Sequence, residues 1–118
     1  MSTTVLIVDD HPSFRATARI LLQSEGYDVV GEAADGVSAL RAARELEPDL
    51  VLLDVQLPDF DGFEVASRLR AFDGGGPHIV LVSSRDGADY GSLISGSGAR
   101  GFIAKAELSG DAIAALLP

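Results

Sequence analysis

The sequence predicts an α/β fold in which a five-stranded parallel sheet carries helices on both faces. Short apolar runs alternate five times with segments of helical periodicity, which is the pattern of repeated β-α units. The runs at residues 5–8 and 50–53 contain no polar residue, as expected of strands buried on both faces. Carboxylates follow both runs directly, and ligands of such sheets bind at the carboxyl ends of the strands. We therefore expect a functional site at that edge.

The bulk composition indicates one soluble domain. The chain has 118 residues, of which 47% are hydrophobic and 23% charged, and it has no cysteine. Without cysteine there is no disulfide or thiol chemistry, which agrees with a reducing compartment, so we expect a cytoplasmic protein. No apolar run reaches the roughly 18 residues of a membrane span, and residues 1–4 lack the basic start of a signal peptide. A net charge of −9 disfavours nucleic-acid binding by this domain and favours cations.

The first half of the chain predicts two strands, each followed by a helix. Residues 4–8 form a strand, and Pro12 suits the first position of a helix over 12–24, which Gly26 ends. A short strand at 28–31 precedes a helix over 36–46, capped by Asp35 or Ser38 and stopped by Pro48. Its periodicity predicts four inward residues, which are Val37, Leu40, Ala43 and Leu46.

The second half predicts three further strands. A strand at 50–53 leads through a loop of turn-forming residues to a helix over 63–72, and a glycine-rich connector precedes a strand at 79–82. A helix over 88–95 is expected to be loosely ordered, because Gly91, Ser92, Ser95 and Gly96 are poor helix formers. A strand at 102–104 and a helix over 109–117 complete the pattern.

Polar residues that can carry chemistry end four of the five strands: Asp9 and Asp10, Asp54, Ser83 and Lys105. Three neighbouring carboxylates repel one another unless a proton or a cation intervenes, and oxygen ligands with open positions suit Mg²⁺ beside a phosphate. Asp54 is then a third ligand or a nucleophile that forms an acyl phosphate. Lys105 can screen the incoming charge and Ser83 can offer a hydroxyl.

Each of these residues alone also has a structural interpretation, as a solvated strand end, a surface lysine or a turn serine. Their joint order at successive strand ends favours a site. His11 and His78 are interpreted as structural or exposed. Of the two, His11 is the stronger candidate for a ligand, because it follows the acid pair directly. Arg15, Arg68 and Arg70 are interpreted as parts of solvated helix faces.

With these residues placed, nearly the whole chain resembles the receiver domain of two-component response regulators. Four motifs carry the resemblance: VLIVDDHP at 5–12, VLLDVQLPDFDG at 51–62, IVLVSS at 79–84 and GARGFIAK at 98–105. The sequence DDHP followed by Phe14 and Arg15 is most similar to the NarL/FixJ subfamily, whose output is a LuxR-type helix-turn-helix domain. The resemblance implies a flavodoxin-like, CheY-like fold with strand order 2-1-3-4-5, and a receiver domain that spans 1–118.

The resemblance also implies the role of each site residue. Asp54 would accept a phosphoryl group from a sensor histidine kinase. Mg²⁺ would be bound by Asp10 and Asp54, by the backbone carbonyl of Gln56, and by Asp9 through water. Ser83 and Lys105 would hold the phosphoryl oxygens, and Ser83 and Phe102 would form the switch that changes the surface of the fourth helix, fifth strand and fifth helix. Such a domain catalyses only its own phosphorylation and dephosphorylation. A homodimer on activation and control of transcription are the expected consequences.

Two features depart from the family pattern: the residue after the lysine, and the glycine- and serine-rich helix at 88–95. The family commonly has a cis-proline after the lysine, whereas this chain has Ala106, and a non-proline cis bond costs ~3 kcal/mol. Gln56 and Arg85 occupy the positions where the family tunes dephosphorylation. Since the chain ends after a short helix and includes no output domain, we expect it to be part of a longer DNA-binding regulator rather than an isolated receiver.

Three alternatives remain at the level of the sequence. A phosphatase of the haloacid dehalogenase type would need Asp-x-Asp after the first strand, where this chain has Asp9, Asp10 and His11. A cobalamin-binding module would need glycine where Phe14 stands. A receiver-like interaction module that is never phosphorylated is the strongest rival, because all five receiver positions are filled acceptably.

Overall fold

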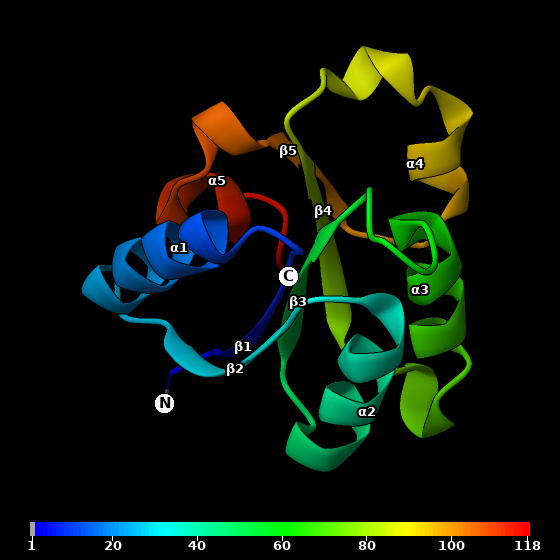
Figure 1. Ribbon diagram of the computed structural model, residues 1–118. Helices are drawn as coiled ribbons and strands as arrows, with labels where there is room; N and C mark the ends of the chain where they lie inside the picture. Colours follow the sequence, from blue (N-terminus) through cyan, green and yellow to red (C-terminus); the bar gives the residue numbers. More distant parts are fainter. Residues whose placement is uncertain (1) are drawn as a thin grey trace.

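The five-stranded parallel sheet and its predicted strand order are confirmed by the structure, a computed structural model that describes residues 2–118 (Figure 1). Met1, the first residue of the predicted domain, lies outside the described residues. The strands are β1 (Thr4–Val8), β2 (Asp28–Ala33), β3 (Leu50–Asp54), β4 (His78–Ser83) and β5 (Gly101–Ala104), in the order β2-β1-β3-β4-β5. The helices are α1 (Pro12–Ser24), α2 (Gly36–Leu46), α3 (Gly62–Arg70), α4 (Ser92–Gly96) and α5 (Gly110–Ala114).

The core lies on both faces of this sheet. Residues 5–8 of β1 have no exposed surface and alternate between the two sides, with Leu6 and Val8 in one cluster and Val5 and Ile7 in the other. Helices α1 and α5 cover the second cluster, whereas α2, α3 and α4 lie over the first (Figure 1). The prediction of strands buried on both faces is therefore confirmed. None of the helices within residues 2–118 has the length and apolarity to cross a membrane.

Helices α1 and α2 have the predicted bounds, and Asp35 is the cap of α2. Its Oδ1 accepts the backbone N–H of Ser38 at 2.8 Å, and the Ser38 hydroxyl donates back to the same oxygen at 2.6 Å. The bond from the Ser38 backbone satisfies one of the N–H donors that a helix start leaves without a partner.

The predicted inward face of α2 is partly wrong. Ala43 is buried and Leu40 packs against the core, as predicted, but Val37 and Leu46 are 49% and 43% exposed, and Ala39 is buried in their place. The reason is close packing against the loop before α3. A Cβ built at Gly36 would lie 2.4 Å from the ring of Phe60, so the start of α2 lies too close to this loop for a larger residue at position 36.

Helix α4 is shorter than predicted and does not begin at Ala88. Residues Gly87–Asp89 form a 3₁₀ turn, Gly91 has a φ of 53°, and α4 occupies only Ser92–Gly96. A residue with a positive φ cannot continue a right-handed helix, so Gly91 separates the 3₁₀ turn from α4. Helices α3 and α5 also end earlier than predicted, at Arg70 and Ala114.

Fast amide exchange is expected in α4. The helix has a single turn and contains no buried residue, whereas the 13-residue α1 buries Ala18 and Leu22. A one-turn helix gains few hydrogen bonds for the backbone that it orders, so it opens locally without global unfolding. Hydrogen–deuterium exchange followed by NMR should show the amides of residues 94–96 exchanging at least about tenfold faster than the central amides of α1. Equal protection in the two helices would contradict the expectation of a loosely ordered α4.

Candidate functional site

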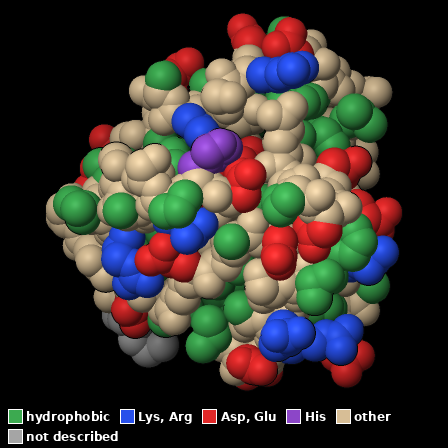
Figure 2. Space-filling model, viewed as in Figure 1, with side chains coloured by type: hydrophobic (Ala, Val, Ile, Leu, Met, Phe, Trp, Pro, Cys, Tyr) green, Lys and Arg blue, Asp and Glu red, His purple; other side chains and the backbone are tan. Residues whose placement is uncertain are grey.

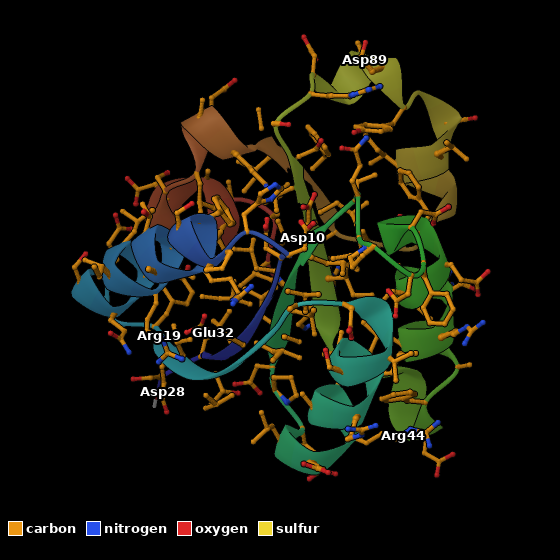
Figure 3. The ribbon with its side chains drawn as sticks, in the orientation of Figure 1. Asp10, Arg19, Asp28, Glu32, Arg44 and Asp89 are labelled. Atoms are coloured by element: carbon orange, nitrogen blue, oxygen red, sulfur yellow. The ribbon has the colours of Figure 1, made fainter. Side chains whose placement is uncertain are left out.

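The carboxyl ends of the central strands bring the predicted site residues to one edge of the sheet. In the parallel register Val8 lies opposite Leu53, so Asp9 and Asp54 follow at the same level. Ser83 lies opposite Ala104, which places Lys105 one residue further on. Figure 3 shows Asp10 at this edge, where β1 ends near the ends of β3 and β4. Asp9 and Asp54 are buried and Asp10 is exposed.

Lys105, the only lysine in the sequence, joins the two buried acids. Its Nζ lies 2.5 Å from Oδ2 of Asp9 and 3.3 Å from Oδ2 of Asp54. The same ammonium lies 4.5 Å from the centre of the Phe14 ring, a cation–π contact that the sequence did not reveal. The lysine is therefore held between acids on one side and an aromatic ring on the other.

Asp9 is fixed by the start of the following helix. Its Oδ1 accepts the backbone N–H of His11 at 2.8 Å and lies 3.0 Å from His11 Nδ1. Within residues 2–118, no donor meets Oδ2 with hydrogen-bond geometry, although Lys105 Nζ is close to it. Arg15 donates from Nη1 to the carbonyl oxygen of Asp9 at 2.6 Å, and its side chain is only 18% exposed. The interpretation of Arg15 as a solvated side chain was therefore wrong.

Arg15 also joins α1 to β2 beside the site. Its Nε donates to Glu32 at 3.0 Å, and Arg19 donates to the other oxygen of Glu32 at 2.7 Å. Figure 3 shows Arg19 and Glu32 side by side between these two elements. The two arginines hold the pKa of Glu32 below its usual range, Arg19 through the stronger hydrogen bond. These contacts anchor the helix that follows Asp9 and Asp10.

The pKa values of the two buried acids, Asp9 and Asp54, are shifted in opposite directions. Burial raises the pKa of Asp54 to about 6, and the charge of Asp9 adds to that rise against the opposing hydrogen bond from the Gln56 N–H and the charge of Lys105. Burial also disfavours the charge of Asp9, but the adjacent Lys105 ammonium and the contacts with the backbone and ring of His11 outweigh it and lower the pKa of Asp9. Burial disfavours the charge of Lys105 too, but Asp9 and Asp54 outweigh it and raise the pKa of Lys105. The site therefore favours Asp9⁻ and Lys105⁺ and disfavours charge on Asp54.

The acidic cluster fits a small divalent cation. Asp9, Asp10, His11 and Asp54 each offer a ligand atom, and these atoms all lie within 4.8 Å of one another. Carboxylate oxygens of this number suit Mg²⁺, and the buried Oδ2 of Asp9 lacks a well-aligned donor. In the space-filling view, a histidine and acidic side chains gather near the centre of this face (Figure 2). His11 is 65% exposed, as predicted, but contacts both neighbouring acids.

Ser83 is buried at the same edge, but its hydroxyl is bonded to Tyr90 rather than to the acids. Ser83 Oγ lies 2.8 Å from Tyr90 Oη and accepts the backbone N–H of Arg85 at 3.1 Å. The Tyr90 ring packs against Phe63 and Phe102, with ring centres 5.7 Å and 5.8 Å apart. Sequence reasoning missed Tyr90, because the poor helix pattern around it gave no signal for a contact seven residues back along the chain.

Asp59 is a second residue that the sequence did not single out. Its carboxylate accepts the backbone N–H groups of Gly36 and Val37 at the start of α2, at 2.7 Å and 3.0 Å. These hydrogen bonds lower the pKa of Asp59, the one from Gly36 most strongly. Asp59 thereby ties the loop after Gln56 to α2. Its position in a turn-rich loop was the only signal in the sequence.

The remaining expectations concern residues at the rim of the site. No peptide bond within residues 2–118 is cis, so the Lys105–Ala106 bond is trans, and Lys105–Glu107 form a 3₁₀ turn. His78 is exposed, as predicted, and accepts a hydrogen bond from Arg100 Nε at 3.3 Å. Gln56 is exposed and pairs with Asp61 across the loop.

A family model for the response regulator receiver domain matches residues 5–117. The chain belongs to this family. The resemblance drawn from the strand-end motifs is thus confirmed, and the receiver family is a family of signalling domains.

Similar proteins agree with this assignment. The positive transcription regulator BvgA of Bordetella pertussis is 42% identical over 108 residues, which are 91% of this chain and 51% of BvgA. The receiver domain of NarL from Mycobacterium tuberculosis has 32% identity and a TM-score of 0.85, covering 98% of this chain and 96% of that one. A chain of the CheX–CheY–BeF₃–Mg²⁺ complex from Borrelia burgdorferi has 27% identity and a TM-score of 0.83, covering 97% and 85%. The receiver spans about half the length of the curated relatives that it matches.

Proposed function

We propose that this receiver domain, residues 1–118, accepts a phosphoryl group on Asp54 from the phosphohistidine of a sensor kinase. The observation that carries the proposal is the contact of one ammonium group, Lys105 Nζ, with both Asp54 and Asp9 at the edge where Asp10 is also exposed. A buried carboxylate with an adjacent cation is positioned for attack on phosphorus, because the cation stabilises the charge of the incoming phosphoryl oxygens.

The transfer is a substitution at phosphorus. A carboxylate oxygen of Asp54 attacks, a P–O bond forms, and the P–N bond of the donor breaks. The electron pair of that bond leaves with the imidazole, which takes up a proton. Lys105 is then close enough to pair with the phosphoryl oxygens instead of the free carboxylate. The deprotonated form of Asp54 is the nucleophile, and a pKa of about 6 leaves that form predominant at pH 7.

Mg²⁺ is the proposed cofactor of this transfer. Asp10 and Asp54, the backbone carbonyl of Gln56, and Asp9 through water would hold the ion, which would neutralise phosphoryl charge when bound. The cluster supports this assignment, because ligand atoms of Asp9, Asp10 and Asp54 lie within 4.8 Å of one another, and a similar CheY complex contains Mg²⁺ and BeF₃. Asp10 is exposed and contacts His11 at 3.1 Å, whereas Asp9 is buried and accepts the backbone N–H of His11.

Phosphorylation would act as a switch on a transcriptional output. In the proposal, the Ser83 hydroxyl moves to the phosphoryl group, Phe102 follows it inward, and the surface formed by α4, β5 and α5 changes. This shift of population would promote a homodimer and release a helix-turn-helix DNA-binding domain elsewhere in the longer protein. The similarity to a transcription regulator over about half of that protein's length supports such an arrangement.

Intact-mass measurement after incubation with Mg²⁺ and phosphoramidate tests the proposal. We expect the wild type to gain the mass of one phosphoryl group, and to gain none after Asp54→Asn or when EDTA removes the metal. Asp28→Asn is the matched control, because Asp28 is an exposed acid at the start of β2 and should leave the mass gain unchanged. A wild type that gains no mass from this donor or from kinases would instead favour the interaction module that is never phosphorylated.

A further inference from the structure

The hydroxyl of Ser83 is hydrogen-bonded to Tyr90 in this structure. Its oxygen lies 2.8 Å from Tyr90 Oη and accepts the Arg85 N–H at 3.1 Å. The side-chain contacts of Asp54 within residues 2–118 are instead the Gln56 N–H and Lys105 Nζ. Two hydrogen bonds thus hold the side chain of Ser83 in one rotamer, and neither of them leads to the phosphoacceptor.

The ring of Tyr90 is itself held firmly. It packs edge-on against Phe63 of α3 and is tilted against Phe102 of β5, with centre distances of 5.7 Å and 5.8 Å. Its backbone N–H donates to Gly87, and its carbonyl accepts the N–H of Leu93 in α4. The tyrosine therefore connects the strand that ends in Ser83 with Phe63, Phe102 and α4.

We propose that Tyr90 is a positioning residue that holds the Ser83 hydroxyl away from the phosphoryl site of the resting domain. The inference rests on the proposed function, because it assigns to Tyr90 an effect on phosphorylation. In the proposed switch the Ser83 oxygen moves toward the phosphoryl group on Asp54, and that movement breaks its 2.8 Å contact with Tyr90. The same step frees Tyr90 between Phe63 and Phe102, which connects occupancy of the site to the position of α4.

Tyr90→Phe tests this role without removing the ring. The variant keeps the packing against Phe63 and Phe102 and loses only the hydroxyl. Phosphorylation by phosphoramidate should become about two- to tenfold faster, as expected for the loss of one neutral hydrogen bond that restrains the resting state. A merely structural tyrosine would leave the rate unchanged or lower it.

Tyr27→Phe is the matched control, since Tyr27 is the other tyrosine of the chain and its hydroxyl donates to the Gly110 carbonyl at 3.2 Å. Its rate should equal that of the wild type. In a Ser83→Ala background, Tyr90→Phe should have no effect, because the bond is already absent. An unchanged or slower Tyr90→Phe variant overturns the inference, and so does an equal acceleration in the Ser83→Ala background.

A readout without phosphate separates this inference from the proposed function. A wild type that gains no mass disproves the phosphoacceptor role, and the hydrogen bond is then judged from the Ser83 side-chain rotamer by NMR couplings. A single Ser83 rotamer in the wild type, with averaging over several rotamers in Tyr90→Phe, supports the restraint by Tyr90. The same rotamer in both proteins overturns it.

Discussion

Replacing Lys105 by methionine is expected to lower the free energy of unfolding by about 2–3 kcal/mol at pH 7 without divalent cations. The variant keeps an apolar side chain beside Phe14 but removes the ammonium group from Asp9 and Asp54. Asp9 has no exposed surface, so its charge would remain buried without the cation that lies 2.5 Å from it. Breaking a buried pair by removing one partner is far more destabilising than losing a surface pair.

Arg68→Met is the control for this change. Arg68 pairs with Glu64 one helical turn away at 3.1 Å, and both side chains are about half exposed, so its loss should alter stability by only about 0.5 kcal/mol. Urea unfolding of both variants measures the difference. Saturating Mg²⁺ should reduce the deficit of Lys105→Met, since a cation among the carboxylates replaces part of the missing charge. Equal stability losses in the two variants would show that Lys105 does not stabilise the resting site.

The sequence predicted best those features that local chemistry determines. The apolar run at residues 5–8 identified β1 because four consecutive apolar residues need two buried faces, and all four are buried. The positions of Asp9, Asp54, Ser83 and Lys105 followed from strand ends alone, because parallel strands align their carboxyl ends. This much of the fold and of the candidate site required no knowledge of tertiary contacts.

The features that sequence reasoning missed depend on packing between distant segments. The predicted inward face of α2 included Val37 and Leu46, but Phe60 approaches Gly36 closely, and the buried residues of the helix are Gly36, Ala39 and Ala43. The hydrogen bond between Tyr90 and Ser83 depends on the turn after β4, where the 3₁₀ segment Gly87–Asp89 leads the chain to Tyr90. No periodicity encodes either contact.

The buried carboxylate of Asp54 is expected to lower the stability of the protein at neutral pH, so Asp54→Asn should be more stable than the wild type. The pKa of Asp54 is about 6 in the folded protein, against a reference value of 3.8. Between these values the folded state keeps a proton that the unfolded state has released, so this group stabilises at low pH and its contribution is lost as pH rises toward 6. The asparagine variant should gain about 1–2 kcal/mol at pH 7, after allowance for screening by solvent.

Urea unfolding of wild type and Asp54→Asn in EDTA, from pH 4 to pH 7, measures this effect. The difference between the two proteins should be near zero at pH 4 and should grow until about pH 6. Asp9→Asn provides a control of opposite sign, because the pKa of Asp9 is lowered and its charge therefore stabilises the fold above the reference value of 3.8. Asp9→Asn should be less stable than the wild type at pH 7 and approach it as the solution is acidified. If both variants were destabilised at pH 7, Asp54 would not be the strained acid of this cluster, and its burial would have to be offset by a stronger pairing with Lys105.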